Sequence, residues 1–340
     1  MKDFHNYSLL CHNTFGIDAR CRRFVEYGSA EEAQQLAGSL TPDDAPLLIL
    51  GGGSNLLLTA DFPGTVLHSA VRGIEILPGA SDCDDILVRC GSGEVFDDVV
   101  DFAVAHGAHG AENLSLIPGE VGASAVQNIG AYGAEAKDII LSVEAVEIAS
   151  GKVVEISNAD CEYSYRQSRF KHEWKNRYLI THVTYRLHRT FRPALDYGNI
   201  RAALAERGIK EPTARQLRDT IIAIREAKLP DPKVTGNAGS FFMNPIVEKT
   251  VYEQLAAQYP GMPHYTVDEG HEKIPAGWMI DQCGWKGKQL GRAGVYKNQA
   301  LVLVNCGGAT GEEVVTLCQA IQRDVKQKFG IDIHPEVNVI

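Results

Sequence analysis

The chain has 340 residues, of which 44% are hydrophobic and 22% charged, values typical of a globular protein rather than a disordered one. This length predicts two or three domains, and no apolar stretch approaches the about 20 residues of a membrane-spanning helix. The formal net charge of −10 argues against a nucleic-acid partner but permits a local basic pocket for a small anion. The N-terminus has no basic segment followed by a long apolar stretch, so we expect no signal peptide and a cytoplasmic protein with no membrane partner.

The cysteines are scattered along the chain and include no CxxC pair. They stand at positions 11, 21, 83, 90, 161, 283, 306 and 318. Closely spaced thiols would be expected of a zinc site, and a secreted disulfide scaffold would be shorter. We therefore predict reduced thiols and no metal site.

The first half of the chain predicts mostly strands. Residues 46–50 and 56–58 form two apolar runs, and residues 86–90 form another, followed by a helix with apolar residues at helical spacing between positions 95 and 103. Residues 143–148 and 152–156 predict a hairpin around Ser150-Gly151, a two-residue turn in which glycine supplies a positive φ. Residues 179–187 predict a further strand.

The second half predicts helices separated by short strands. Thr213 and Gln216 form a capping-box pattern at the start of a helix that ends before Pro230. A helix over 251–258, a strand over 301–304 and a strand over 337–340 follow. The helix over 312–329 has Val315, Cys318, Ile321 and Val325 on one stripe and stops at Gly330. Because consecutive strands are so often neighbours, the fold class is α+β rather than a doubly wound sheet.

A glycine cluster at 90–96 resembles a dinucleotide-binding fingerprint and fails it. The third glycine position is Phe96, which removes the close contact between helix and strand. Glu94 places a carboxylate where a pyrophosphate would bind. This cluster predicts a capped helix start instead.

A second cluster, Gly51, Gly52, Gly53, Ser54 and Asn55, lies between two apolar strands. Three glycines let successive N–H groups point into one concavity that suits phosphate oxygens, although a plain tight turn explains them equally well. The stretch 116–133 is rich in glycine and alanine, so its backbone can press against a flat ligand, while a crowded loop packed on itself remains the alternative. Together the two segments suit a long cofactor such as FAD.

At these residues the sequence resembles the UDP-N-acetylenolpyruvoylglucosamine reductase family. The resemblance spans nearly the whole chain, in order. Its motifs are Asn13-Thr-Phe15, Gly51-Gly-Gly-Ser-Asn55, Ile117-Pro-Gly119, Gln127-Asn-Ile-Gly-Ala-Tyr-Gly133, Tyr165-Arg-Gln-Ser168, Gly236-Asn-Ala-Gly-Ser-Phe-Phe-Met-Asn-Pro245, Gln299-Ala-Leu-Val-Leu-Val-Asn305 and Pro335-Glu-Val337.

The resemblance implies an α+β protein with the vanillyl-alcohol-oxidase-type (PCMH-type) FAD-binding fold of two subdomains and a C-terminal α+β substrate-binding domain. We place the subdomains at 1–70 and 71–212 and the substrate domain at 213–330. An arrangement in which the strand 331–340 returns to the first subdomain stays open. The implied reaction is the NADPH-dependent reduction of an enolpyruvyl ether of a nucleotide sugar to a lactyl ether, in peptidoglycan precursor synthesis. The insertion at 193–200, which bears Tyr197, resembles the longer of the family's two forms.

Hydride addition to an enolpyruvyl group moves negative charge towards its carboxylate, so the site needs a cation or hydrogen-bond donors there and one proton donor. Arg166 offers a planar fork suited to a carboxylate. The family match assigns Arg166 and Glu336 to stabilising the enolic intermediate and Ser240 to protonating it. Without that match, Arg166 would be interpreted as solvated, Ser240 as a turn residue and Glu336 as exposed at an edge strand.

The family match also assigns ligand contacts. The residues expected to contact the substrate are Tyr197, Lys228, Asn244 and Gln299. Those expected to contact FAD are Gly51, Gly52, Gly53, Ser54, Asn55, Ile117, Gly119, Gly122, Gln127, Asn128, Gly130 and Gly133. Lys228 follows a helix with Arg215, Arg218 and Arg225, which we interpret as a solvated charged face.

Two other functions stay open. One is an FAD-dependent oxidase of the same fold, and the other is a non-catalytic flavin-binding module. Many such oxidases bind flavin covalently through a His or Cys near the phosphate loop, and residues 51–55 contain neither. We therefore expect non-covalent FAD, NADPH as hydride donor, a nucleotide-sugar substrate and a monomer.

Overall fold

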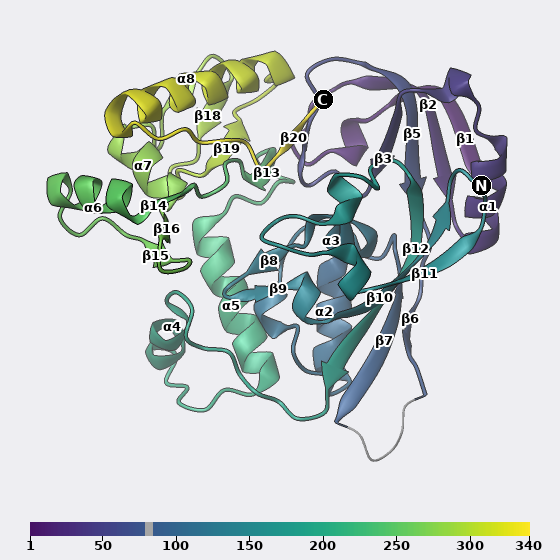
Figure 1. Ribbon diagram of the computed structural model, residues 1–340, viewed down its shortest axis with the longest axis horizontal. Helices are drawn as coiled ribbons and strands as arrows, with labels where there is room; N and C mark the ends of the chain where they lie inside the picture. Colours follow the sequence, from purple (N-terminus) through teal and green to yellow (C-terminus); the bar gives the residue numbers. More distant parts are fainter. Residues whose placement is uncertain (79–83) are drawn as a thin grey trace. The chain divides into compact units, whose positions relative to one another are not determined.

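The computed structural model describes residues 1–78 and 84–340, so Cys83 lies outside the described residues (Figure 1). The chain forms two compact units. The first comprises Met1–Tyr7, Cys21–Gly52 and Phe62–Glu226, and the second comprises Ser8–Arg20, Gly53–Asp61 and Ala227–Ile340.

The first unit begins with a four-stranded sheet in the order β1-β2-β5-β3. Its strands are β1 (Lys2–Ser8), β2 (Arg20–Tyr27), β5 (Phe62–Ser69) and β3 (Leu47–Leu50). The strands β2 and β3 both pair in parallel with β5, which requires crossover connections. The helix α1 (Ala30–Ser39) provides one of them, and its buried Leu36 packs in a core cluster with Val25 and Leu67.

A second sheet of the first unit is antiparallel, in the order β11-β10-β12-β7-β6. Its strands are β11 (Val153–Ser157), β10 (Ile140–Glu147), β12 (Tyr178–His188), β7 (Asp85–Gly91) and β6 (Ile74–Ile76). Buried residues of β7, β10 and β12 form one core, to which α2 (Phe96–Ala105) and α3 (Val121–Gln127) also contribute (Figure 1). A short hairpin, β8 (Gly130–Ala131) and β9 (Ala134–Glu135), follows α3.

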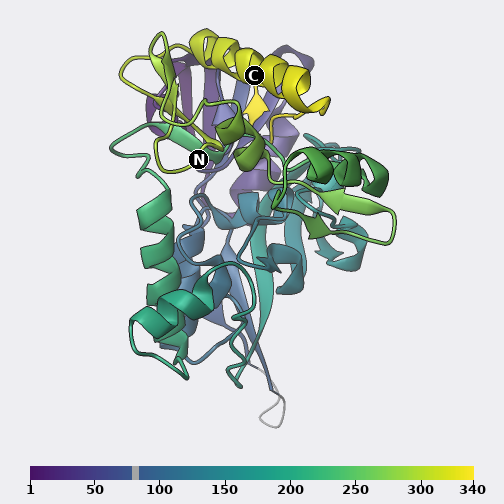
Figure 2. The same ribbon diagram turned by 90° about the vertical axis from the view of Figure 1, so that its left-hand side faces the viewer.

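The first unit ends with α4 (Ile200–Glu206) and most of α5 (Ala214–Lys228), which lie side by side in Figure 2. Leu204 of α4 and Leu217 and Ile221 of α5 belong to one buried cluster. The predicted capping box of α5 is confirmed: Gln216 N–H donates to Thr213 Oγ1 at 3.2 Å, and Thr213 N–H donates to Gln216 Oε1 at 3.0 Å.

The second unit contains two small antiparallel sheets. The first, in the order β13-β19-β18-β17, consists of β13 (Asn237–Ser240), β19 (Val302–Asn305), β18 (Ala293–Val295) and β17 (Gln289–Leu290). The second consists of β14 (Ile246–Glu248), β16 (His271–Lys273) and β15 (Tyr265–Thr266). The helices of this unit are α6 (Lys249–Gln258), α7 (Ala276–Gln282) and α8 (Gly311–Phe329).

The C-terminal strand β20 (Asn338–Val339) pairs in parallel with β4 (Leu56–Leu57), inside the second unit. Thr59 N–H donates to the carbonyl oxygen of Ile340 at 2.6 Å, so the last residue is tied to the segment after β4. The chain end therefore packs against the residues that follow the glycine cluster at 51–55.

Most predicted elements are confirmed, including the hairpin of β10 and β11, in which Gly151 has φ +66°. Three details were wrong. The turn has more than the two predicted residues, because residues 148–151 lie between Glu147 and Lys152, where Glu147 N–H donates to the Lys152 carbonyl at 2.9 Å. Val315 is only half-buried, because the apolar stripe of α8 runs through Val314 instead. The start of α2 has no side-chain cap within the described chain, since Glu94 turns away and accepts a hydrogen bond from Gly73 N–H at 2.6 Å.

Candidate active site

The two glycine-rich segments meet in the first unit. A Cβ on Gly51 would lie 3.0 Å from Cβ of Ala123, and a Cβ on Gly52 would lie 3.4 Å from Cα of Gly119. Side chains at these positions would push the two backbones apart, so glycine permits their close approach. Gly122 is packed in the same way, since a Cβ there would lie 3.0 Å from Cβ of Ser92.

The remaining residues of the 51–55 cluster, from Gly53 on, belong to the second unit and are hydrogen-bonded to the C-terminal tail. Gly53 has φ +63°, and a Cβ there would lie 2.0 Å from the carbonyl oxygen of His12. Asn55 Nδ2 donates to the carbonyl oxygen of Glu336 at 3.3 Å, and Asn338 Nδ2 donates to the carbonyl oxygen of Asn55 at 3.0 Å. The C-terminal tail thus fixes the segment containing Ser54 and Asn55.

The end of the second glycine segment is a series of strained backbone positions. Asn128 and Tyr132 have φ of +44° and +50°, a region that residues with a Cβ adopt at a cost in free energy. The Asn128 amide is used inside the protein: Nδ2 donates to the Ser164 carbonyl at 2.8 Å, and Oδ1 accepts from Lys137 N–H at 3.0 Å. Any contact of Asn128 with a ligand is therefore left to its backbone, while Gln127 ends α3.

Arg166 lies against this segment. Its Nη2 donates to the Gly130 carbonyl at 2.6 Å and its Nη1 to the Asn128 carbonyl at 3.4 Å. A Cβ on Gly130 would lie 3.0 Å from Nη1, so a side chain there would displace the guanidinium. Arg166 itself has φ +58°. The interpretation of Arg166 as a solvated side chain was wrong, because the fork is half-buried and held by backbone carbonyls.

Tyr197 lies at the same end of the first unit. Its Cβ would be 3.2 Å from a Cβ on Gly133, which has φ +81°. The structure thus brings the predicted substrate residue Tyr197 against the predicted cofactor residue Gly133.

The arginines of α5 do not form one solvated face. Arg218 is 5% exposed, and Arg225 donates from Nε to the Leu116 carbonyl at 3.2 Å. Burial lowers the pKa of Arg225, and the nearby charge of Arg166 lowers it further against the opposing effects of Tyr132 and Asp97.

Sequence reasoning missed Arg225 as a candidate residue, although a signal was present. Arg218, Ile221 and Arg225 are spaced three and four residues apart, so both arginines lie on the apolar stripe of the helix. An arginine at such a position is either paired or placed to meet an anion.

The second unit brings Ser240 and Glu336 together. Ser240 ends β13 opposite Val302, and the next residue, Phe241, accepts the N–H of Glu336 at its carbonyl oxygen over 2.8 Å. Phe242 and Pro335 form a further bridge. Phe241 is fully buried, so this junction of two distant segments is anchored in the core.

Two predicted substrate residues meet at the start of α7. Asn244 Oδ1 accepts from Ala276 N–H at 2.9 Å, and Gln299 Oε1 lies 3.1 Å from a Cβ on Gly277. Lys228, the last residue of α5, is exposed, and Asn298 Nδ2 donates to the preceding Ala227 carbonyl at 3.2 Å. The proximity of Lys228 to Ser240 stays a prediction.

Comparison with known proteins identifies the family. A model of the FAD binding domain matches residues 22–157, and a model of the C-terminal domain of UDP-N-acetylenolpyruvoylglucosamine reductase matches residues 231–340. A UDP-N-acetylenolpyruvoylglucosamine reductase of Bacteroides fragilis is 56% identical over 98% of this chain and 99% of its own length. That of Flavobacterium johnsoniae is 46% identical over 98% of both chains. This chain belongs to the UDP-N-acetylenolpyruvoylglucosamine reductase family.

A crystal structure from the same family has the same fold. The reductase of Thermus caldophilus is 22% identical and superimposes with a TM-score of 0.66, covering 99% of this chain and 98% of its own. The predicted fold class, FAD cofactor and reductase activity are confirmed by these matches.

The residues present fit the FAD of this reductase family. Gly51 and Gly52 carry no side chain and lie against Ala123 and Gly119, so the two segments bring bare backbone, the kind of surface that suits a pyrophosphate, to one place. The partly buried carboxylate of Glu120 also lies beside them, a negative charge that a pyrophosphate disfavours, and Nε2 of His68 lies 3.3 Å from its Oε1 as a partner.

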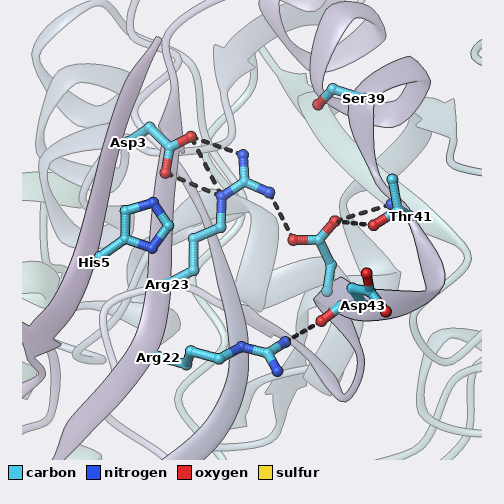
Figure 3. Close-up of a pocket in the computed structure, with 8 residues that line it drawn as sticks. Asp3, His5, Arg22, Arg23, Ser39, Thr41 and Asp43 are labelled. Atoms are coloured by element: carbon cyan, nitrogen blue, oxygen red, sulfur yellow. Dashed lines mark hydrogen bonds and ion pairs between the residues drawn. The ribbon is translucent and has the colours of Figure 1, made fainter.

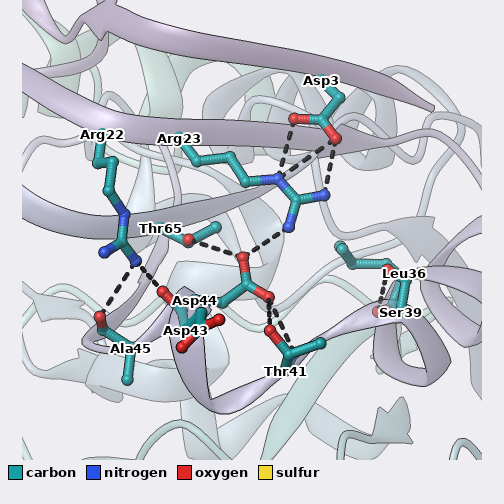
Figure 4. Close-up of polar contacts among 10 residues, drawn as sticks. All are labelled: Asp3, Arg22, Arg23, Leu36, Ser39, Thr41, Asp43, Asp44, Ala45 and Thr65. Atoms are coloured by element: carbon teal, nitrogen blue, oxygen red, sulfur yellow. Dashed lines mark hydrogen bonds and ion pairs between the residues drawn. The ribbon is translucent and has the colours of Figure 1, made fainter.

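A polar pocket of about 470 Å³ in the first unit is lined by none of the predicted site residues. Asp3, His5 and Arg22 are among the residues that line it (Figure 3). Its charges satisfy one another: Arg23 forks onto Asp3 at 2.7 Å and Asp44 at 2.6 Å (Figure 4). Arg22 donates to the backbone carbonyls of Asp43 and Ala45. These pairs bind β1 and β2 to the segment after α1.

The described cysteines are free thiols, and within residues 1–78 and 84–340 no three His, Cys, Asp or Glu side chains are grouped as in a metal site. No helix among these residues combines the length and apolar character needed to cross a membrane.

Proposed function

We propose that this protein reduces the enolpyruvyl group of UDP-N-acetylglucosamine enolpyruvate to the lactyl ether of UDP-N-acetylmuramate, with NADPH as the source of electrons. The observation that carries the proposal is the identity of 56% over 98% of the chain to a reductase of that name. FAD held by the glycine-rich segments would supply the hydride-transfer chemistry that links NADPH to the substrate. The product is a precursor of peptidoglycan.

Arg166 is proposed to bind the substrate carboxylate. Its fork is fixed on the Gly130 and Asn128 carbonyls before substrate arrives, so no reorganisation is needed when negative charge develops. The close approach of Arg225, whose charge is disfavoured by burial and by Arg166, adds positive potential that an anion would relieve.

Ser240 is proposed to protonate the carbon next to that carboxylate, and Glu336 to stabilise the enolic intermediate. The hydrogen bond from Glu336 N–H to the Phe241 carbonyl holds the two residues on adjoining segments. We expect the Glu336 carboxyl group to carry a proton beside the substrate carboxylate, which lets it donate a hydrogen bond.

The remaining roles follow the family pattern. Tyr197, Lys228, Asn244 and Gln299 are proposed to contact the substrate, and the insertion at 193–200 to be the tyrosine loop of the longer form. The residues proposed to contact FAD are Gly51, Gly52, Gly53, Ser54, Asn55, Ile117, Gly119, Gly122, Gln127, Asn128, Gly130 and Gly133. We also propose a cytoplasmic monomer, with FAD-binding subdomains at 1–70 and 71–212 and a substrate domain at 213–330.

The test is turnover of the enolpyruvyl nucleotide sugar with NADPH by the purified protein, preceded by an anaerobic titration with NADPH at flavin wavelengths. If the protein is the reductase, NADPH should bleach the visible absorbance of its flavin, and the enolpyruvyl sugar nucleotide should restore that absorbance without oxygen. Reoxidation by oxygen alone would support an oxidase, and no bleaching would support a module without turnover. Acid precipitation should leave the flavin in solution, since residues 51–55 contain no His or Cys.

A further inference from the structure

Leu116, which directly precedes the Ile117–Gly119 segment, has both of its backbone polar groups held by side chains. Its N–H donates to Oδ1 of Asp97 at 2.5 Å, and its carbonyl oxygen accepts from Nε of Arg225 at 3.2 Å. Leu116 has φ +57°, a conformation that costs free energy for a residue with a Cβ. The two side chains hold the backbone where leucine alone would not remain.

Asp97 is itself fixed by a buried arginine. Arg218 Nη1 donates to Oδ1 of Asp97 at 2.6 Å and Nη2 donates to Oδ2 at 3.0 Å, a bidentate pair in which the Arg218 side chain is 6% exposed. Such forks fix geometry more narrowly than single hydrogen bonds. The carboxylate that receives the Leu116 N–H therefore has a defined position.

The first turn of α2 holds the segment at a second point. Phe96, the residue before Asp97, donates its N–H to the carbonyl oxygen of Gly119 at 3.0 Å. The beginning and end of Leu116–Gly119 are thus both attached to α2, and Gly119 is the residue whose Cα lies 3.4 Å from a Cβ on Gly52.

We propose that Asp97, held by Arg218, is a positioning residue for FAD binding. It stabilises the left-handed conformation of Leu116 and thereby sets the path of Ile117 and Gly119 beside the glycine cluster at 51–55. The inference rests on the proposed contact of Ile117 and Gly119 with FAD. In this proposal Asp97 and Arg218 act through the backbone of Leu116 and not by contact with the cofactor.

Asp101 provides a matched control. It also lies on α2, and it accepts from Arg218 Nε at 3.1 Å and from Arg215 Nη1 at 2.5 Å. Asp101→Ala therefore removes ion pairs between the same two helices and leaves the Leu116 N–H bonded. A purely structural role of the α2–α5 ion pairs predicts equal effects for the two alanine variants.

The measurement is the dissociation constant of FAD for the full-length chain stripped of flavin, followed by flavin fluorescence, with folding checked by circular dichroism. We expect Asp97→Ala to raise the dissociation constant at least tenfold and Asp101→Ala less than threefold. Asp97→Asn, which keeps an acceptor oxygen but loses the charged fork, replaces Asp97→Ala if the latter does not fold. It should give an intermediate value.

A rescue separates positioning from general destabilisation. Glycine adopts φ +57° without a steric cost, so Asp97→Ala should weaken FAD binding at least threefold less in the Leu116→Gly variant than in the wild-type chain. Equal effects in the two chains, or equal effects of Asp97→Ala and Asp101→Ala, overturn the proposal.

Gly119→Ala tests the proposed function on which the inference rests. With φ +117° at this position, alanine is strained, and FAD binding should weaken. If FAD binding does not weaken, the segment does not contact FAD, and both the proposed FAD contact of Ile117 and Gly119 and the positioning role of Asp97 are wrong. If Gly119→Ala weakens binding and Asp97→Ala does not, only the positioning role is overturned.

Discussion

The carbonyl oxygen of Gly130 accepts a hydrogen bond of 2.6 Å from Nη2 of Arg166. Together with the longer contact of Nη1 to the Asn128 carbonyl, it orients the guanidinium, so the side chain that is proposed to receive a carboxylate is already fixed in space. Lysine could supply the positive charge but not the planar fork that this geometry depends on.

Arg166→Lys should therefore slow substrate reduction by about 10²–10³-fold, the loss typical of one preorganised donor, while flavin reduction by NADPH stays nearly unchanged. The two half-reactions are measured separately by stopped-flow absorbance. Arg177→Lys is the control, since Arg177 is half-exposed and pairs with Glu147 in the hairpin region. Equal slowing of both half-reactions would show that Arg166 serves folding or FAD binding instead.

Ser240→Ala should leave flavin reduction by NADPH nearly intact and slow reoxidation by the enolpyruvyl substrate severely. Ser240 is exposed and its backbone pairs with Val302, so loss of the hydroxyl should not disturb β13. General acid catalysis contributes about 10²–10⁴-fold, which sets the expected loss. Thr316→Ala, which removes an exposed hydroxyl from α8, should have no effect on either rate. A Ser240→Ala variant slowed equally in both half-reactions would make Ser240 a structural residue.

Local patterns in the sequence predicted many of the elements. The Ser150-Gly151 turn defines the hairpin of β10 and β11, and the Thr213–Gln216 box starts α5, because both signals involve residues within one turn. Pairing between distant strands is different. That β5 takes parallel partners on both sides depends on segments whose apolar patterns do not encode their neighbours.

The site was predicted in the same uneven way. Motifs gave Arg166, Ser240 and Glu336 as candidates. The sequence did not show that the buried Arg218 pairs with Asp97, a residue 121 positions earlier. A charged side chain on an apolar stripe can be solvated at a helix end or paired in the interior, and only the partner's location decides. The left-handed conformation of Leu116 was also absent from the pattern, since leucine does not favour it.

Glu336→Gln should keep a useful fraction of turnover because its amide can still donate a hydrogen bond. Glu336→Ala should lose about 10²–10³-fold or more, as expected for a preorganised donor. Because the backbone N–H and carbonyl of Glu336 make the contacts to Phe241 and Asn55, both variants should keep the C-terminal pairing and bind FAD as the wild type does. The deciding measurement is single-turnover reoxidation of reduced flavin by substrate. Wild-type speed in Glu336→Ala would contradict the assignment.

His68 links two carboxylates in the first unit and predicts a pH dependence of stability. Its Nδ1 lies 3.2 Å from Oε2 of Glu26 and its Nε2 lies 3.3 Å from Oε1 of Glu120, in a side chain that is 8% exposed. Burial opposes a charge on the imidazole, but the hydrogen bond to Glu120 and the charges of both carboxylates outweigh it. The pKa of His68 is therefore raised above its ordinary value.

A raised pKa in the folded protein means that protonated His68 stabilises the fold. This contribution is complete below the unfolded-state pKa of about 6.5 and is lost as the pH rises through the higher folded-state pKa. The free energy of unfolding, from urea titrations followed by circular dichroism at saturating FAD, should thus exceed that of His68→Gln by more at about pH 6 than at about pH 9. One unit of pKa difference corresponds to about 1.4 kcal/mol, so such a change is measurable.

His182→Gln is the matched control for this prediction. His182 also contacts a carboxylate, with Nδ1 2.8 Å from Oε1 of Glu144, but burial lowers its pKa with help from Arg89, against the opposing effect of Glu144. For a group whose folded-state pKa is depressed, the neutral form is favoured by folding, and stability is lost as the pH falls. The difference between wild type and His182→Gln should therefore grow towards high pH, opposite to that of His68→Gln. The same sign for both histidines would mean that His68 is not held as an imidazolium between Glu26 and Glu120.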